Sequence, residues 1–137
     1  MPQLHLIEQP PVPPVQQITP VEVQAMQRAF VNLAEKWDIT DDQAAVLMGD
    51  ISVRTFRRWK AGDLGRAGVD TAARLSNLMG IHKALRLLFK EPVRGYGWIK
   101  RPNDVFGGAP ALDVMLHGQL TDIMRVRRYL DAMRSPW

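Results

Sequence analysis

The stretch TDDQAAVLMGDISVRTFRRWKAG, residues 40–62, decides the fold class of this chain. Thr40 followed by Gln43 forms a capping box, in which each side chain bonds the backbone N–H of the other residue, so a helix is expected to begin there. Gly49 can adopt the left-handed conformation that ends a helix. Ser52 is a good cap for the helix that follows. The stretch therefore predicts two short helices joined by a tight turn.

The second of these helices is predicted to be amphipathic. On a helical wheel Val53, Phe56 and Trp59 fall on one side, whereas Arg54 and Arg58 face away from them. No acidic residue within this helix can pair with its cations, which disfavours the alternative of a merely solvated basic surface.

The preceding helix carries the small pair Ala44-Ala45, which permits close approach, and Gly49 supplies a sharp turn. This is the geometry of a helix-turn-helix, whose second helix enters the major groove of DNA. There an arginine can donate two hydrogen bonds to a guanine edge or bind phosphates. We predict DNA contacts at Ser52, Arg54, Thr55, Arg57, Arg58 and Lys60.

Longer helices flank this unit. Thr19 and Pro20 predict the start of a helix over residues 20–37, whose apolar residues recur at helical spacing. After a glycine-rich loop, Asp70 is expected to cap a long helix that ends before Pro92. Within it, Gly80 predicts either a kink or a close crossing with another helix. His82 is interpreted as an amphipathic residue at the edge of the core.

The C-terminal part begins with a turn-rich, aromatic segment over residues 95–108. A short helix over 111–116 and a last helix over about 119–133 are expected to follow. No β-strand is needed anywhere, so the predicted fold class is all-α.

Charge is uneven along the 137 residues. The chain has 18 Lys and Arg against 14 Asp and Glu, a net charge of +4. Residues 1–40 carry −2, residues 41–101 carry +6, and residues 102–137 are balanced. A basic central block beside a neutral one suggests a polyanion-binding unit joined to a unit with another task.

The sequence shows no set of residues typical of a catalytic site. There is no cysteine, the three histidines (His5, His82, His117) lie far apart, and there is no glycine-rich phosphate loop. We therefore predict no catalytic residue, no metal site, no cofactor and no enzymatic activity. The apolar runs are too short to cross a membrane, and the first residues show no secretory signal. A cytoplasmic protein is expected.

An ordered set of C-terminal residues carries a family resemblance: Trp98-Ile99, Pro102-Asn103, Phe106, Gly108, Pro110, Leu112, Met115, Gly118 and Tyr129-Leu130. It resembles the toxin-binding domain of the Xre/MbcA/ParS antitoxins, and residues 20–90 resemble the Xre-like helical domain that precedes it. The resemblance implies a type II antitoxin that neutralises a toxin with a RES domain, an enzyme that destroys NAD. Such antitoxins usually also repress their own operon.

We accordingly divide the chain into a proline-rich arm (1–18), a helix-turn-helix DNA-binding domain (19–92) and a small helical toxin-binding domain (93–137). The arm is interpreted as a spacer, with a proline-rich ligand for an aromatic groove as the alternative. The expected partners are the RES-domain toxin, operator DNA and a second copy of this chain within a toxin–antitoxin assembly.

Eight residues are singled out for toxin binding: Trp98, Lys100, Asn103, Phe106, Arg125, Arg128, Tyr129 and Trp137. For Trp98 and Phe106, core packing is favoured over direct contact. Arg125, Arg128 and Trp137 are the stronger contact candidates because no neighbouring residue needs them.

A second function fits the same helix-turn-helix. A stand-alone transcriptional repressor would act as a homodimer and would use the C-terminal unit for dimerisation alone. The residues leave both readings open, with the antitoxin favoured.

Overall fold

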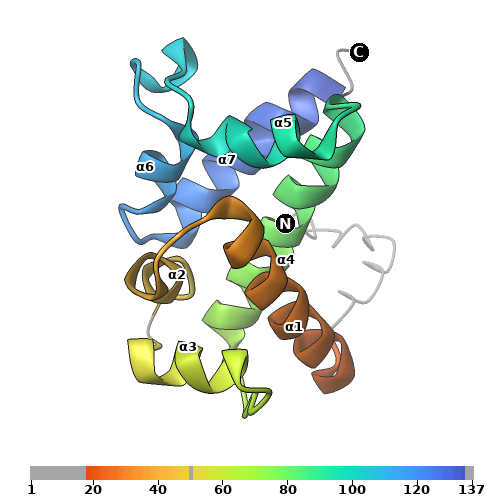
Figure 1. Cartoon of the computed structure of the whole chain (residues 1–137), viewed down its shortest axis with the longest axis vertical. Helices are drawn as coiled ribbons and strands as arrows, with labels where there is room; N and C mark the ends of the chain where they lie inside the picture. The colour runs from red at the N-terminus through yellow and green to blue at the C-terminus, as the bar shows by residue number, and fades with distance from the viewer. Residues whose placement is uncertain (1–17, 50, 135–137) are drawn as a thin grey trace, which may run out of the picture.

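The computed structural model describes residues 18–49 and 51–134, which fold into helices packed around one core (Figure 1). The elements, in chain order, are α1 (Pro20–Trp37), α2 (Asp41–Leu47), α3 (Val53–Lys60), α4 (Val69–Leu88), α5 (Pro92–Gly97), η1 (Trp98–Lys100), η2 (Asp104–Phe106), α6 (Ala111–Met115) and α7 (Leu120–Arg134). The described residues contain no strand, and their one isolated β-bridge joins Pro102 to Pro110. The all-α prediction is confirmed.

The predicted caps of the first three helices are present. The Thr19 side chain accepts from the backbone N–H of Glu22 at the start of α1. Thr40 and Gln43 form the reciprocal capping box of α2, and Ser52 accepts from the N–H of Thr55 at the start of α3. Each such cap stabilises a helix end by about 1 kcal/mol.

One expectation for the long helix α4 is corrected and another is confirmed. Its N-cap is Gly68, not Asp70, which lies one residue inside the helix and pairs with Arg74. The helix ends at Leu88, before Pro92 as expected, and Pro92 opens a further helix, α5, which runs into the segment predicted to be turn-rich. Proline fits the first turn of a helix because its missing N–H has no intrahelical acceptor there.

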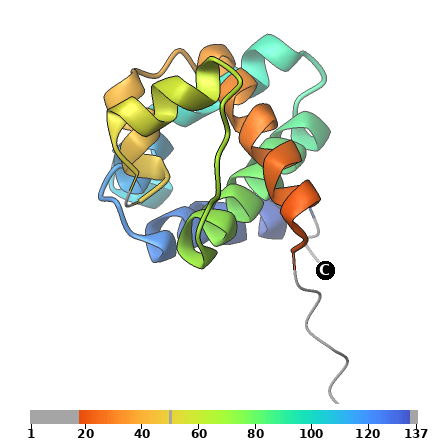
Figure 2. The same cartoon turned by 90° about the horizontal axis from the view of Figure 1, so that it is seen from below.

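Gly80 marks a close crossing between α4 and α7, and α4 continues through it without a break. A Cβ added at Gly80 would lie 2.5 Å from Nε of Arg127, whose guanidinium occupies that space. Nη1 of Arg127 donates to Oδ1 of Asn77 on α4 over 3.3 Å. Seen from below, α4 lies beside α7, and the loop that leaves α3 crosses to the start of α4 (Figure 2).

The core contains apolar residues from both halves of the chain. Fully buried side chains include Phe30, Trp37 and Phe56 from the first three helices and Ile123 and Leu130 from α7. Burying one such side chain stabilises the fold by about 1.5–3 kcal/mol. Because Leu75, Leu78 and Ile81 of α4 belong to the same cluster, α4 is the element that both halves share.

The turn between α2 and α3 depends on Gly49, which has φ +88°. A Cβ there would lie 2.7 Å from Oδ2 of Asp70 and 2.8 Å from Nε of Arg74. At Gly62, with φ +94°, nothing lies within 4 Å of an added Cβ.

Gly49→Ala should therefore lower the free energy of unfolding by about 3 kcal/mol, from backbone strain and overpacking together. Gly62→Ala should lower it by about 1–2 kcal/mol, from backbone strain alone. Urea denaturation measures both. Equal losses would contradict the packing of Asp70 and Arg74 beneath the turn.

Candidate functional site

The outer face of α3 presents the predicted recognition residues. Phe56 and Trp59 are buried beneath it, which leaves Arg54 and Arg58 exposed. Neither arginine has an ion pair among the described residues. Ser52 caps the helix, and its hydroxyl donates to that of Thr55 over 3.1 Å. Both guanidinium groups are therefore available to bind phosphates or base edges.

Arg57 and Lys60, also predicted to contact DNA, are tied to α2. Nε of Arg57 and Nζ of Lys60 lie 3.0 and 2.9 Å from the two carboxylate oxygens of Asp41. These hydrogen bonds lower the pKa of Asp41 below its ordinary value of 3.8, and the bond from Lys60 has a larger effect than the bond from Arg57. A helical wheel of α3 includes only the residues of that helix. It could not show an acidic partner such as Asp41, which lies in α2.

Three aromatic rings predicted for toxin binding pack on one another. Trp98 and Tyr129 are stacked with centroids 6.2 Å apart, and Phe106 meets Tyr129 edge-on at 5.7 Å. Phe106 is buried, whereas Trp98 and Tyr129 are half-buried. Such pairs add about 0.5–1.5 kcal/mol beyond the area they bury. These rings join α7 to the segment that follows α5.

The expectation that no neighbour needs Arg125 is wrong. Its guanidinium lies 5.3 Å from the ring centroid of Phe106, a cation–π contact that helps cover this ring. Arg128 is exposed and has no ion pair among the described residues. Trp137 lies outside the described residues.

Two further predicted toxin contacts have intramolecular partners. Nζ of Lys100 donates to the carbonyl of Asp38 over 2.6 Å, at the left-handed C-cap of α1. The Asn103 side chain accepts from the N–H of Val105 and caps η2. Both residues therefore have a structural role in addition to any contact with a partner.

His82 lies at the edge of the core, as interpreted from the sequence. Its ring stacks on Tyr96 of α5 with centroids 5.9 Å apart. Partial burial, and secondly the charge of Arg86, lower the pKa of His82 below 6.5. Both effects favour the neutral imidazole.

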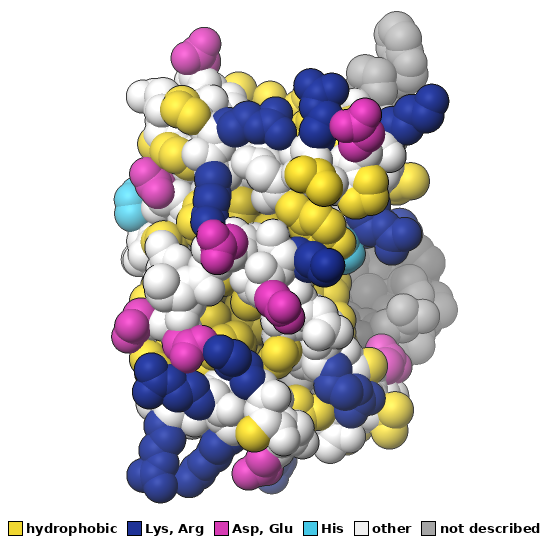
Figure 3. Space-filling view, in the orientation of Figure 1, with side chains coloured by type: hydrophobic (Ala, Val, Ile, Leu, Met, Phe, Trp, Pro, Cys, Tyr) yellow, Lys and Arg dark blue, Asp and Glu magenta, His cyan; other side chains and the backbone are white. Residues whose placement is uncertain are grey.

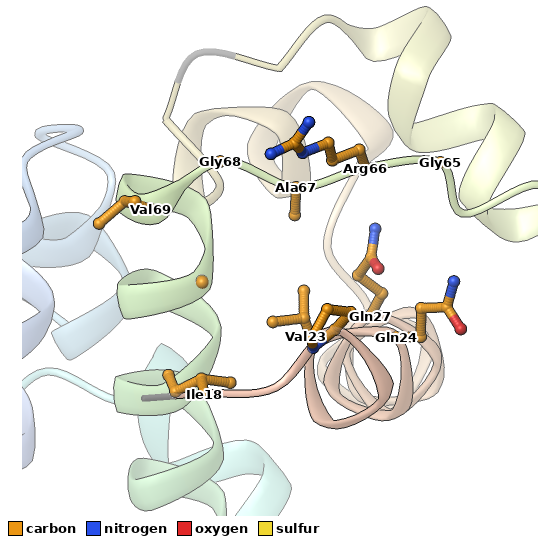
Figure 4. A pocket seen from close by; sticks show the side chains of 11 residues that line it. Ile18, Val23, Gln24, Gln27, Gly65, Arg66, Ala67, Gly68 and Val69 are labelled. Carbon is orange, nitrogen blue, oxygen red and sulfur yellow. The ribbon is translucent and has the colours of Figure 1, made fainter. Parts of the chain in front are cut away.

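A hollow of about 570 Å³ lies between the start of α1 and the loop before α4 (Figure 4). Ile18, Val23, Ala67 and Val69 line it, and Arg66 is its ionisable residue. Gln27, also in the lining, donates from Nε2 to the carbonyl of Leu64 over 2.9 Å and so fixes the loop to α1. Among the described residues that line this hollow, no two are titratable.

Across the residues that the structure describes, no three His, Asp or Glu side chains gather as metal ligands would. Within the same residues, no helix has the length and apolar character needed to cross a membrane.

Taken together, a helix-turn-helix with a basic outer face and a second helical unit packed on the same long helix define a class of DNA-binding regulator. Residues 16–80 match the antitoxin Xre-like helix-turn-helix domain. Residues 84–135 match the antitoxin Xre/MbcA/ParS C-terminal toxin-binding domain. The chain belongs to the Xre/MbcA/ParS antitoxin family, and its partners are accordingly a toxin and DNA.

A relative extends the similarity over most of the chain. The uncharacterized protein y4oB of Sinorhizobium fredii (strain NBRC 101917 / NGR234) is 46% identical over 113 residues, which are 82% of this chain and 87% of the relative. The two family matches meet within α4, between residues 80 and 84. The domain boundary proposed at residues 92 and 93 stays a prediction.

The ion pairs of Asp41 give a titration test. Because the folded-state pKa is depressed, this carboxylate stabilises the fold above about pH 4, and the stabilisation is lost as pH falls through the folded-state pKa. NMR titration should place the pKa of Asp41 below 3.8, and Lys60→Gln should raise it more than Arg57→Gln. If neither substitution changes the pKa of Asp41 from its value in the wild-type protein, the pairs do not form in solution.

Proposed function

We propose that this protein neutralises a RES-domain toxin that degrades NAD and represses the operon that encodes both proteins. The observation that carries the proposal is the joining, through α4, of an exposed basic recognition helix to a toxin-binding domain. In this function the chain needs no enzymatic activity of its own, and it works in the cytoplasm, where NAD and the operator are found.

For repression, α3 would enter the major groove of the operator. Arg54 and Arg58 would read guanine edges or bind phosphates, and Ser52 and Thr55 would add hydroxyl contacts. Arg57 and Lys60 would lie at the flank with part of their charge compensated by Asp41. A homodimer would present two such helices to two half-sites, about 34–36 Å apart for one helical turn of DNA.

For neutralisation, the antitoxin would bind the toxin and cover the groups that recognise NAD. Blocking an enzyme in this way requires only a stable interface.

Replacing Arg54 and Arg58 together with Ala should weaken operator binding by about 30-fold or more, because each bidentate base contact contributes about 1–3 kcal/mol. If both arginines bind phosphates instead, the slope of log K against log salt should fall by up to about 1.8 for each subunit bound. Fluorescence anisotropy at several salt concentrations measures both quantities.

The matched control is Lys83→Ala with Arg86→Ala, which removes the same charge from the far half of α4. It should leave operator affinity within about twofold. Toxin neutralisation should survive in the Arg54/Arg58 variant, and its loss there would contradict the assignment of α3 to DNA.

Co-expression separates the antitoxin from the stand-alone repressor. If the protein is an antitoxin, a RES-domain protein from the same operon should arrest growth and deplete NAD when expressed alone, and do neither when co-expressed with this chain. Unchanged NAD and growth with that protein alone, together with a free homodimer of this chain, would favour the repressor.

A further inference from the structure

Most cations of the basic block predicted from the sequence gather in two clusters at opposite ends of the molecule. One covers α3, and the other lies over α5 and the end of α4 (Figure 3). The second cluster contains four exposed cations without an ion pair among the described residues: Lys83, Arg86, Lys90 and Arg94. Glu91 is the acidic residue in this segment. A helix-turn-helix at the other end of the molecule does not account for these charges.

Two large apolar side chains are exposed among these cations. Leu87 is 62% exposed and Val93 is 81% exposed, although each lies in a well-formed helix. Exposed apolar residues surrounded by charge are typical of protein interfaces, where apolar anchors form the centre and charged residues the rim.

The surface around these anchors is already hollowed. A hollow of about 320 Å³ is lined by His82, Lys83, Arg86 and Leu87. A second, of about 510 Å³, lies between the end of α1 and α5, and its lining includes Lys36, Asp38, Val93, Tyr96 and Lys100. The stacked pair His82 and Tyr96 links them, since one ring lines each hollow.

The charges facing these hollows are mainly positive. Lys83 and Arg86 line the first, and Lys36 and Lys100 line the second together with Asp38, whose carboxylate is 4.0 Å from Nζ of Lys100. Burial lowers the pKa of His82, which disfavours its charged form. The surface therefore favours an acidic partner.

We propose that this α4–α5 surface, made of Lys83, Arg86, Leu87, Val93 and the two hollows, is where the toxin docks. The inference rests on the proposed function. It assigns to the toxin an acidic face with two projecting apolar side chains that enter the hollows, while Lys83 and Arg86 pair with its carboxylates.

Three observations favour a toxin over other occupants. Most of the surface lies within residues 84–135, the match to the toxin-binding domain. A second copy packed symmetrically would bring like charges together. Duplex DNA would use the cations but leave Leu87 and Val93 without an apolar partner.

Three of the toxin contacts predicted from the sequence already have a structural role. Phe106, Tyr129 and Arg125 hold the C-terminal unit together, whereas Leu87 and Val93 make no comparable use of their apolar area. Because α3 lies at the opposite end, DNA and toxin can bind one chain at the same time.

The test uses the RES-domain protein of the same operon, made catalytically inactive and titrated into the full antitoxin by calorimetry. Leu87→Glu with Val93→Glu should weaken binding at least 100-fold, since it places two carboxylates opposite an acidic face. Lys83→Ala with Arg86→Ala should weaken it about tenfold and reduce its dependence on salt.

Two controls match these variants. Val105→Glu adds a carboxylate at another exposed apolar residue of the C-terminal unit, 48% exposed in η2, and should change affinity less than twofold. Arg54→Ala with Arg58→Ala removes two cations from α3 and should also change the affinity for the toxin less than twofold. Unchanged operator binding and melting temperature in the Leu87/Val93 variant show that it is folded.

The outcomes separate the two proposals. If the wild-type protein does not bind the RES-domain protein, the proposed function fails. If it binds, and the Leu87/Val93 variant binds equally well, this docking surface is wrong and the function stands. If the Lys83/Arg86 variant loses operator affinity as the Arg54/Arg58 variant does, the surface contacts DNA and the inference is overturned.

Discussion

The buried guanidinium of Arg74 fixes the end of α2 to the first turn of α4. Its Nε lies 2.8 Å from Oδ2 of Asp70, and its Nη1 donates to the carbonyls of Val46 and Leu47 over 3.5 and 3.4 Å. Thr71 adds a bond from its hydroxyl to the carbonyl of Met48. Carbonyls at a helix C-terminus lack intrahelical partners and attract a cation. The direction in which α3 leaves the turn depends on this arrangement, because a buried charge must keep its partners.

The same helix that fixes the helix-turn-helix also supports the C-terminal unit. Three residues after Arg74, Asn77 accepts from Arg127 of α7, and Gly80 makes room for that guanidinium. The last turns of α4 carry Lys83, Arg86 and Leu87. One rigid helix thus relates the DNA-binding end to the opposite end, so an antitoxin of this size needs no flexible linker between its two tasks. The separation of the basic residues into two clusters follows from the length of α4.

Local signals in the sequence were sufficient for most of the fold. Caps at Thr19, Thr40 and Ser52 and the left-handed Gly49 act within four residues, so they predicted helix starts and the tight turn correctly. Contacts between distant segments were not accessible in this way: Asp41 with the α3 cations, Arg125 over Phe106, and Arg74 beneath the turn all join different elements. Leu87 is an apolar residue on the polar side of α4, and the sequence does show this departure from the helical pattern. The structure adds that the side chain is exposed.

The independence of the two ends can be measured on the assembled complex. Inactive RES-domain toxin is titrated into the antitoxin already bound to a labelled operator, and the masses of the species are followed by native mass spectrometry. Because α3 and the α4–α5 surface lie at opposite ends of one rigid unit, we expect one complex that contains toxin, antitoxin and DNA at equimolar toxin. Release of free operator as the toxin binds would show that the two ends compete.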